Sequence, residues 1–201
     1  MKRGLYMQNI NGKERNNMIF FTSDTHFMHD KEFLFIPRGF TNTEDMCKEI
    51  VKRWNEIVKP EDEVYHLGDV VLSDIDAGIE FVKQLNGKIH LIRGNHDTDA
   101  KVERFKNECP NIVSIEWATM IKYNKRYIFL SHCPSITRTL EDAPNKQGIL
   151  NFYGHTHQEN NFYNGNPYMY HVGMDSHNLT PISIDEILEE VSKAFHNIEK
   201  I

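Results

Sequence analysis

The sequence predicts a layered α/β fold in a single domain. Short apolar segments, of the length of buried strands, alternate along the chain with amphipathic segments that have helical periodicity. Several of the apolar segments end in a turn that carries Asp, Asn or His, and open α/β sheets place their ligands at that edge. A chain of 201 residues suits one domain and buries enough surface to form a core without a disulfide or a structural metal.

A polar N-terminal extension precedes the predicted domain. Residues 1–17 show neither helical nor strand periodicity, so we expect a mobile extension before a single domain over residues 18–201. Residues 18–22 are apolar and predict a buried strand that ends just before Asp24 and His26. Residues two apart in an extended chain point the same way, so these two side chains should face one point.

An aromatic loop and an amphipathic helix come next. Residues 33–40 contain Pro37, Arg38 and Gly39 and predict a loop. Residues 43–58 have apolar side chains at helical spacing, with Thr43 as the expected N-cap. We expect one stripe of this helix to pack in the core: Met46, Ile50, Trp54, Ile57 and Val58.

Two strands and two helices complete the first half of the domain. Residues 63–67 and 88–92 are short and mostly apolar, and they predict buried strands. Residues 76–85 predict a helix that ends in a left-handed turn at Asn86-Gly87. Residues 100–107 predict a helix that is capped by the polar residues just before it.

The second half is richer in strands. A turn at 123–125 and an Asn/Gly-rich hairpin turn at 160–167 separate some of them, and the polar segment 134–147 predicts no regular element. An amphipathic helix over 185–196 closes the chain. The strands expected here are 112–120, 126–130, 149–153, 168–172 and 181–184.

The composition is ordinary for a globular protein, with 39% hydrophobic and 26% charged residues. No apolar run reaches the roughly 20 residues of a membrane span, and the first residues lack the apolar core of a signal peptide, so we expect no membrane partner. A formal charge of -6 argues against a broad electrostatic contact with nucleic acid. The three cysteines are odd in number and widely spaced, which predicts reduced thiols in a cytoplasmic protein.

Five of the predicted strands are followed by polar clusters that contain Asp, Asn and His as candidate ligands. These candidates include no Cys, so they do not match a thiolate zinc site. Their oxygen and imidazole donors suit Mn²⁺, Fe²⁺ or Zn²⁺. Seven candidates are too many for one ion and suit two ions that share a bridging carboxylate. Each cluster alone also fits a turn, a helix cap or a core histidine, but five at strand ends favour a site. The candidate ligands are Asp24, His26, Asp69, Asn95, His132, His155 and His157.

The order of these clusters resembles that of the calcineurin-like metallophosphoesterase family over about residues 19–181, and the small, uncapped bacterial members are the most similar. The resemblance implies a four-layer α/β/β/α sandwich, in which two mixed sheets lie between helices. It also implies that Asp24, His26, Asp69 and His157 hold one metal. Asp69, Asn95, His132 and His155 would hold the second, with Asp69 as the bridge. The matching motifs are Asp24-Thr25-His26, Gly68-Asp69, Gly94-Asn95-His96-Asp97, His132 and Gly154-His155-Thr156-His157.

The resemblance further implies a binuclear, metal-dependent phosphoesterase. A hydroxide that bridges the two ions would attack a phosphodiester or a phosphomonoester, and the ions would neutralise charge on the phosphate. We expect manganese, with iron, zinc and nickel as alternatives. His96 matches the catalytic histidine of the family and would protonate the leaving group. Asp97 would either orient that imidazole or cap the following helix.

One departure from the family pattern bears on the substrate. Protein phosphatases of this superfamily continue the Gly-Asp motif with a second Asp and a phosphate-binding Arg, whereas Val70-Val71-Leu72-Ser73 follows it here. We therefore expect a small phosphorylated substrate. Arg38 would supply a substitute guanidinium or serve a structural role. His29 would support a ligand, contact the substrate or be a solvated loop residue.

Two other functions stay open. A nuclease of the same superfamily would bind nucleic acid, which the net charge does not indicate. A catalytically silent member would hold metals as an interaction module. The complete ligand set together with His96 favours the enzyme, and the sequence sets no oligomeric state.

Overall fold

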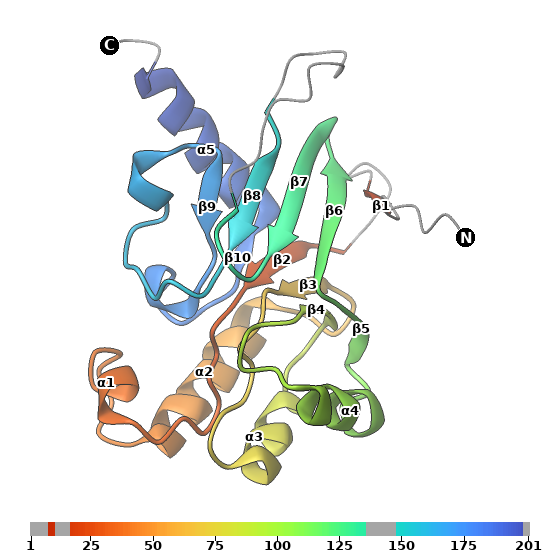
Figure 1. The fold of residues 1–201 in the computed structure, drawn as a ribbon, viewed down its shortest axis with the longest axis vertical. Helices are drawn as coiled ribbons and strands as arrows, with labels where there is room; N and C mark the ends of the chain where they lie inside the picture. The colour runs from red at the N-terminus through yellow and green to blue at the C-terminus, as the bar shows by residue number, and fades with distance from the viewer. Residues whose placement is uncertain (1–7, 11–16, 136–147, 199–201) are drawn as a thin grey trace.

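The computed structural model describes residues 8–10, 17–135 and 148–198. Two five-stranded mixed sheets form its centre, with helices packed against them (Figure 1). The strand order is β10-β2-β3-β4-β5 in the first sheet and β1-β6-β7-β8-β9 in the second. The predicted sandwich of two mixed sheets and helices is therefore confirmed.

The first sheet places the carboxyl ends of four parallel strands along one edge. Strands β2 to β5 run parallel, and β10 pairs antiparallel with β2. The register sets Thr22 beside His66 and His66 beside Leu91, so the segments that follow these strands begin side by side. The strands are β2 (Ile19–Thr22), β3 (Glu63–His66), β4 (Lys88–Ile92), β5 (Ile112–Glu116) and β10 (Ile182–Ser183).

The second sheet contributes its own strand ends to the same region. β7, β8 and β9 are parallel, whereas β6 and β7 form an antiparallel hairpin. Asn124 and Lys125 both have positive φ, as a tight two-residue hairpin turn requires. The strands are β1 (Gln8–Ile10), β6 (Ala118–Tyr123), β7 (Arg126–Ser131), β8 (Leu150–Tyr153) and β9 (Met169–His171).

The helices bury their apolar stripes against the sheets. One core cluster joins the first sheet to α2, α3 and α4, and a second joins both sheets to α5. Phe21 of the first sheet meets Phe152 of the second edge-on, with ring centres 5.0 Å apart. The helices are α1 (Glu32–Phe35), α2 (Thr43–Ile57), α3 (Ile75–Val82), α4 (Asp99–Glu108) and α5 (Ile184–Ile198), and the short 3-10 helices are η1 (Tyr163–Gly165) and η2 (Met174–Ser176).

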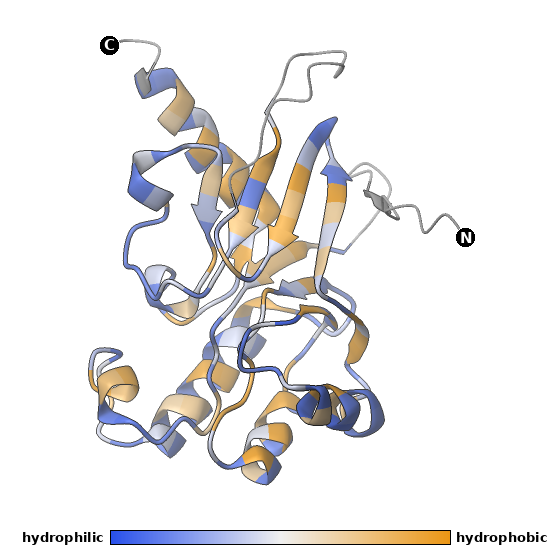
Figure 2. Cartoon of the chain, viewed as in Figure 1, coloured by the Kyte–Doolittle hydropathy of each residue, from blue (hydrophilic) through white to orange (hydrophobic). Residues whose placement is uncertain are grey.

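Hydropathy follows this layering. The central strands and one side of the helices carry hydrophobic residues, whereas the segment from β4 to α4, which contains the Asn-His-Asp turn, is hydrophilic (Figure 2). None of the described helices has the length and apolar character needed to cross a membrane. The three cysteines are free thiols, as predicted.

Residues 8–10, within the predicted N-terminal extension, pair with β6 as an edge strand of three residues. Two sequence predictions are corrected at the level of elements. The strand expected over 112–120 is two strands in different sheets, divided at Trp117. A short helix, α1, lies where an aromatic loop was expected.

The long helix α2 shows two smaller differences. Its N-cap is Asn42, not Thr43: the Asn42 side chain accepts a hydrogen bond from the backbone N–H of Asp45 at 2.9 Å. Four residues of the predicted core stripe are buried, but Ile57 in the last turn is 39% exposed. This side chain instead lines an open cavity beside Pro181.

Candidate metal centre

The first donor cluster consists of Asp24, His26 and His157, which follow β2 and β8. One ligand atom of each lies within 4.8 Å of the others. His26 Nε2 is 3.7 Å from Asp24 Oδ1 and 3.0 Å from His157 Nε2. Asp24 and His26 are buried and His157 is exposed, so the cluster opens on one side.

The second donor cluster consists of Asp69, His132 and His155, again with ligand atoms within 4.8 Å of one another. The His132 Nδ1 atom is 2.7 Å from the carbonyl oxygen of Leu67. A carbonyl can only accept, so Nδ1 carries the proton and leaves Nε2 as the ligand atom. That Nε2 lies 3.5 Å from Asp69 Oδ2 and 2.9 Å from Asn95 Oδ1, which adds an amide oxygen to the cluster.

Asp69 stands between the two clusters. Its Oδ2 is 3.9 Å from His26 Nε2 and 3.5 Å from His132 Nε2. Its Oδ1 accepts a hydrogen bond from the backbone N–H of His96 at 2.9 Å, which fixes the carboxylate plane. Burial raises the pKa of Asp69, but the hydrogen bond and charge of His132 outweigh burial and hold it at about 2.

The donors fit divalent cations. Asp24 is fully buried; its Oδ2 accepts hydrogen bonds from Ser23 Oγ at 2.5 Å and from the backbone N–H of His155 at 2.9 Å. Its Oδ1, which faces His26 and His157, has no hydrogen-bond partner. An unpartnered carboxylate oxygen in the interior is costly unless a cation compensates it. Burial also lowers the pKa of His26 to about 2, which keeps the imidazole in its neutral, ligating form.

The backbone turns into the site through strained conformations. Positive φ is uncommon for residues other than glycine, and such residues cluster at functional sites. Asp24 and His26 do face one point, but left-handed turns bring them together, not the extended chain expected from the sequence. Five candidate ligands have positive φ: Asp24 (58°), His26 (49°), Asp69 (59°), His155 (68°) and His157 (47°).

Two glycines allow the strand ends to approach this closely. A Cβ atom on Gly94 would collide with the backbone and carboxylate of Asp69. A Cβ atom on Gly154 would collide with Ser23 Oγ and lie 2.6 Å from Asp24 Oδ2. The glycines that precede Asn95 and His155 are therefore required by contact between loops of different strands.

Residues 18–179 match the model of the calcineurin-like phosphoesterase superfamily domain. The chain belongs to this superfamily. Membership implies metal-dependent hydrolysis of a phosphoester. Among the residues that the structure describes, the two donor clusters fit such metals.

Individual proteins resemble the chain over most of its length. An uncharacterized protein of Methanocaldococcus jannaschii, MJ1445, is 34% identical over 181 residues, which are 87% of this chain and 92% of the relative. The crystal structure of the protein of unknown function AQ665 from Aquifex aeolicus has a TM-score of 0.65 and 27% identity, and the match covers 87% of this chain and 99% of that one. A structure described as a novel archaeal phosphodiesterase has a TM-score of 0.46 and 20% identity over 77% of this chain and 81% of its own.

His96, the candidate catalytic residue, lies at the rim of the centre. Its side chain is 47% exposed, and its Nε2 is 3.9 Å from Asp69 Oδ2. Its ring centre is 5.9 Å from that of His26. The imidazole belongs to neither donor cluster and faces the same carboxylate oxygen that both clusters share.

Asp97 has a different role from either of those expected. Its buried carboxylate accepts hydrogen bonds from the backbone N–H groups of Asp69 and Gly94, both at 2.8 Å, and of Val70 at 3.2 Å. The N-cap of α4 is Thr98. Both carboxylate oxygens are thus engaged by backbone, so Asp97 fastens the loop after β3 to the loop after β4.

Arg38 takes the structural role rather than that of a phosphate ligand. Its guanidinium donates to the carboxylate of Asp175 at 2.7 and 3.0 Å and to the backbone carbonyl of Asp24 at 2.8 Å. The side chain is only 2% exposed. Because Arg38 is buried and its donors are used in these contacts, it holds Asp175 and the backbone of Asp24 in place and does not face the substrate.

Asp175, in η2, is the site residue that the sequence analysis missed. It joins Arg38 to a candidate ligand, because His157 Nδ1 lies 2.8 Å from Asp175 Oδ2. This bond leaves His157 Nε2 facing the first cluster, as in other carboxylate–histidine–metal arrangements. Burial raises the pKa of Asp175, but hydrogen bonds from His157 and Arg38 lower it well below its usual range. A signal was present, since Asp175 follows a predicted strand as the other polar clusters do.

His29 lies beside a candidate ligand. Its ring centre is 5.5 Å from that of His26 and 5.4 Å from that of Phe33, with edge-on geometry in both pairs. The side chain is partly exposed. This position supports the His26 ring and also borders the open side of the centre.

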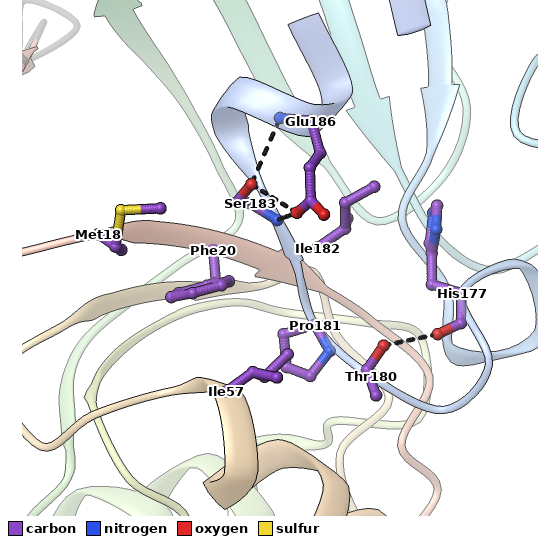
Figure 3. Close-up of a pocket in the computed structure, with 9 residues that line it drawn as sticks. All are labelled: Met18, Phe20, Ile57, His177, Thr180, Pro181, Ile182, Ser183 and Glu186. Carbon is purple, nitrogen blue, oxygen red and sulfur yellow. Dashed lines mark hydrogen bonds between the residues drawn. The ribbon is translucent and has the colours of Figure 1, made fainter. Parts of the chain in front are cut away.

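A separate hollow near the start of α5 offers no comparable chemistry (Figure 3). Its polar groups serve the helix: the backbone N–H of Ser183 donates to Glu186 Oε2 at 3.1 Å, and the backbone N–H of Glu186 donates to Ser183 Oγ at 3.3 Å. This is the reciprocal capping box of a helix N-terminus. The cavity, of about 490 Å³, is lined by Met18, Phe20, Ile57, His177, Thr180, Pro181, Ile182, Ser183 and Glu186.

The Arg38–Asp175–His157 contacts generate a prediction. Asp175→Asn should weaken metal binding by roughly 10- to 100-fold, because the amide cannot hold the His157 ring as a carboxylate does. The measurement is a metal titration of the folded, metal-stripped protein at a temperature well below unfolding. Asp185→Asn is the matched control, since Asp185 accepts from the Tyr123 hydroxyl at 3.0 Å outside both clusters. Unchanged affinity in Asp175→Asn would remove this residue from the centre.

Proposed function

We propose that the chain hydrolyses small phosphodiesters at a binuclear metal centre formed by the two donor clusters. The position of the Asp69 carboxylate carries the proposal: one oxygen, Oδ2, lies within 4 Å of an imidazole nitrogen of each cluster. A carboxylate in that position suits a bridge between two ions. Asp24, His26 and His157 would hold one ion together with Asp69. Asn95, His132 and His155 would complete the second site.

Charge balance supports two cations. When bound, two divalent ions would act as Lewis acids that lower the pKa of water and neutralise charge on phosphate oxygens. Asp24 and Asp69 contribute two negative charges against four positive ones, which leaves about +2 for an anionic substrate. The seven candidate donors are imidazole nitrogens and carboxylate or amide oxygens, with no thiolate among them. Manganese, iron, zinc and nickel all suit such donors, and manganese is our first choice.

His96 has the placement of a general acid. Its backbone N–H is fixed by Asp69 Oδ1 at 2.9 Å, while the ring itself is half exposed toward the open side. The imidazole is thus close to the shared carboxylate without being needed as a ligand. A proton on Nε2 can pass to the departing alkoxide of the substrate.

The chain lacks the phosphate-binding arginine of the protein phosphatases, and this absence favours a phosphodiester as the substrate. A phosphomonoester dianion benefits from an arginine that forms paired hydrogen bonds with its oxygens. Arg38 cannot serve, because Asp175 and the Asp24 carbonyl already engage its guanidinium. A phosphodiester carries one negative charge fewer and depends less on such a contact.

Metal content tests the binuclear assignment. Asp69→Ala should lower occupancy at both sites from about two ions per chain, because one carboxylate is shared. Elemental analysis of the purified protein after metal loading gives the measurement. Asp76→Ala, which removes a carboxylate that is 87% exposed and paired with Arg104, should leave the content unchanged. Full metal content in Asp69→Ala would exclude the bridge.

The general-acid role of His96 is tested with two leaving groups. His96→Ala should retain both ions yet lose roughly 10²–10⁴-fold in kcat on an alkyl leaving group, which needs protonation. The loss should shrink on nitrophenolate, a leaving group that needs almost none. His196→Ala, which removes an exposed imidazole on α5, is the control. Equal losses on both leaving groups would contradict the role.

The diester proposal is tested by paired kinetics. With Mn²⁺ supplied, kcat/KM for bis(nitrophenyl) phosphate should equal or exceed that for nitrophenyl phosphate, and phosphoserine peptides should react negligibly. Arg38→Lys tests the structural assignment of that arginine, and it should leave the diester preference unchanged. A strong monoester preference that disappears in Arg38→Lys would assign the phosphate contact to Arg38 and overturn the proposal.

A further inference from the structure

Trp117 is the single residue between β5 and β6, where the chain passes from the first sheet to the second (Figure 1). It is 70% exposed, whereas the other tryptophan, Trp54, is completely buried. Large aromatic rings are mostly buried in folded proteins, since they gain much from leaving water. A tryptophan that stays in solvent at one fixed point of the fold therefore points to a ligand or a partner.

The backbone places Trp117 beside the second donor cluster on two sides. The backbone N–H of Arg93, two residues before Asn95, donates to the last carbonyl of β5 at 2.8 Å. The first residue of β6 pairs with Ser131, which immediately precedes His132. Trp117 is thus flanked by the two segments that supply Asn95 and His132 to the cluster. The backbone of Trp117 therefore lies at the edge of the proposed active site.

Arg93 supports one face of this indole. Its guanidinium carbon lies 4.0 Å from the centre of the ring. The guanidinium is itself fixed, because it donates to the backbone carbonyl of Asp97 at 2.7 Å and pairs with Asp99 at 2.8 Å. A cation over one face holds the ring by cation–π attraction and leaves the opposite face to solvent. A ring fixed before binding loses little conformational entropy when a ligand stacks on it.

We propose that Trp117, backed by Arg93, is a stacking surface for a planar ring in the organic part of the substrate, with a nucleobase as the expected class. The proposal rests on the proposed phosphodiesterase function and adds the chemistry of the group attached to the phosphate. Stacking on an aromatic side chain accepts any base, because every base has a π-face. The net charge of -6 disfavours a long polyanion and favours a single nucleotide ester.

Two esters with the same leaving group isolate this contact. The nitrophenyl ester of thymidine monophosphate and nitrophenyl methyl phosphate are both monoanionic diesters, and the first carries a nucleoside where the second carries a methyl group. Trp117→Ala should lower kcat/KM by about tenfold or more on the nucleoside ester and change the methyl ester little. Trp117→Phe keeps a ring and should retain most of the nucleoside preference. Val113→Ala, which removes a side chain that is 51% exposed on β5, should alter neither ester.

A binding measurement separates the stacking proposal from the proposed function. Adenosine monophosphate titrated into the Mn²⁺-loaded protein should quench tryptophan fluorescence, ribose 5-phosphate should not, and Trp117→Phe should abolish the effect. This quenching supports stacking even if neither ester is hydrolysed, an outcome that rejects only the phosphodiesterase function. Absence of quenching overturns the stacking proposal. So does an equal loss on both esters in Trp117→Ala, or a dimer that dissociates in that variant while the ester preference stays unchanged.

Discussion

Two buried carboxylates determine the geometry of this centre, because each is both a candidate ligand and a link between loops. Asp69 uses one oxygen to bind the backbone N–H of His96 in the loop after β4. Asp24 uses one oxygen to bind the backbone N–H of His155 in the loop after β8. The second oxygen of each faces the imidazole nitrogens. The loops are therefore positioned by the same groups that would bind the ions.

Residues that are not candidate ligands hold the ligand residues in place through specific hydrogen bonds. Asp97 gathers three backbone N–H groups from the loops after β3 and β4, and the Arg38–Asp175 pair braces both Asp24 and His157. Arginine is suited to this position, since its planar fork can serve a carboxylate and a carbonyl at once. The positive φ angles of the ligand residues cost free energy, and these contacts supply part of the compensation.

The sequence predicted the strand ends and the seven candidate ligands because both depend on local pattern: short apolar runs followed by Asp, Asn or His. It did not predict what depends on contacts distant in the chain. Arg38 donates a hydrogen bond to Asp175, which lies 137 positions later in the sequence, and no local spacing predicts this pair. The break at Trp117 was hidden because β5 and β6 are both extended and only their assignment to different sheets separates them. The helix cap at Asn42 was misplaced by one residue, since two adjacent polar residues both suit an N-cap.

Each donor cluster draws on both sheets. Asp24 and His26 follow a strand of the first sheet and meet His157 from the second, and Asp69 of the first sheet meets His132 and His155 of the second. A pair of ions at this edge would link the two sheets, because each ion would bind donors from both of them. Sliding of the two layers past each other would then break metal–ligand bonds as well as the core contacts between the sheets.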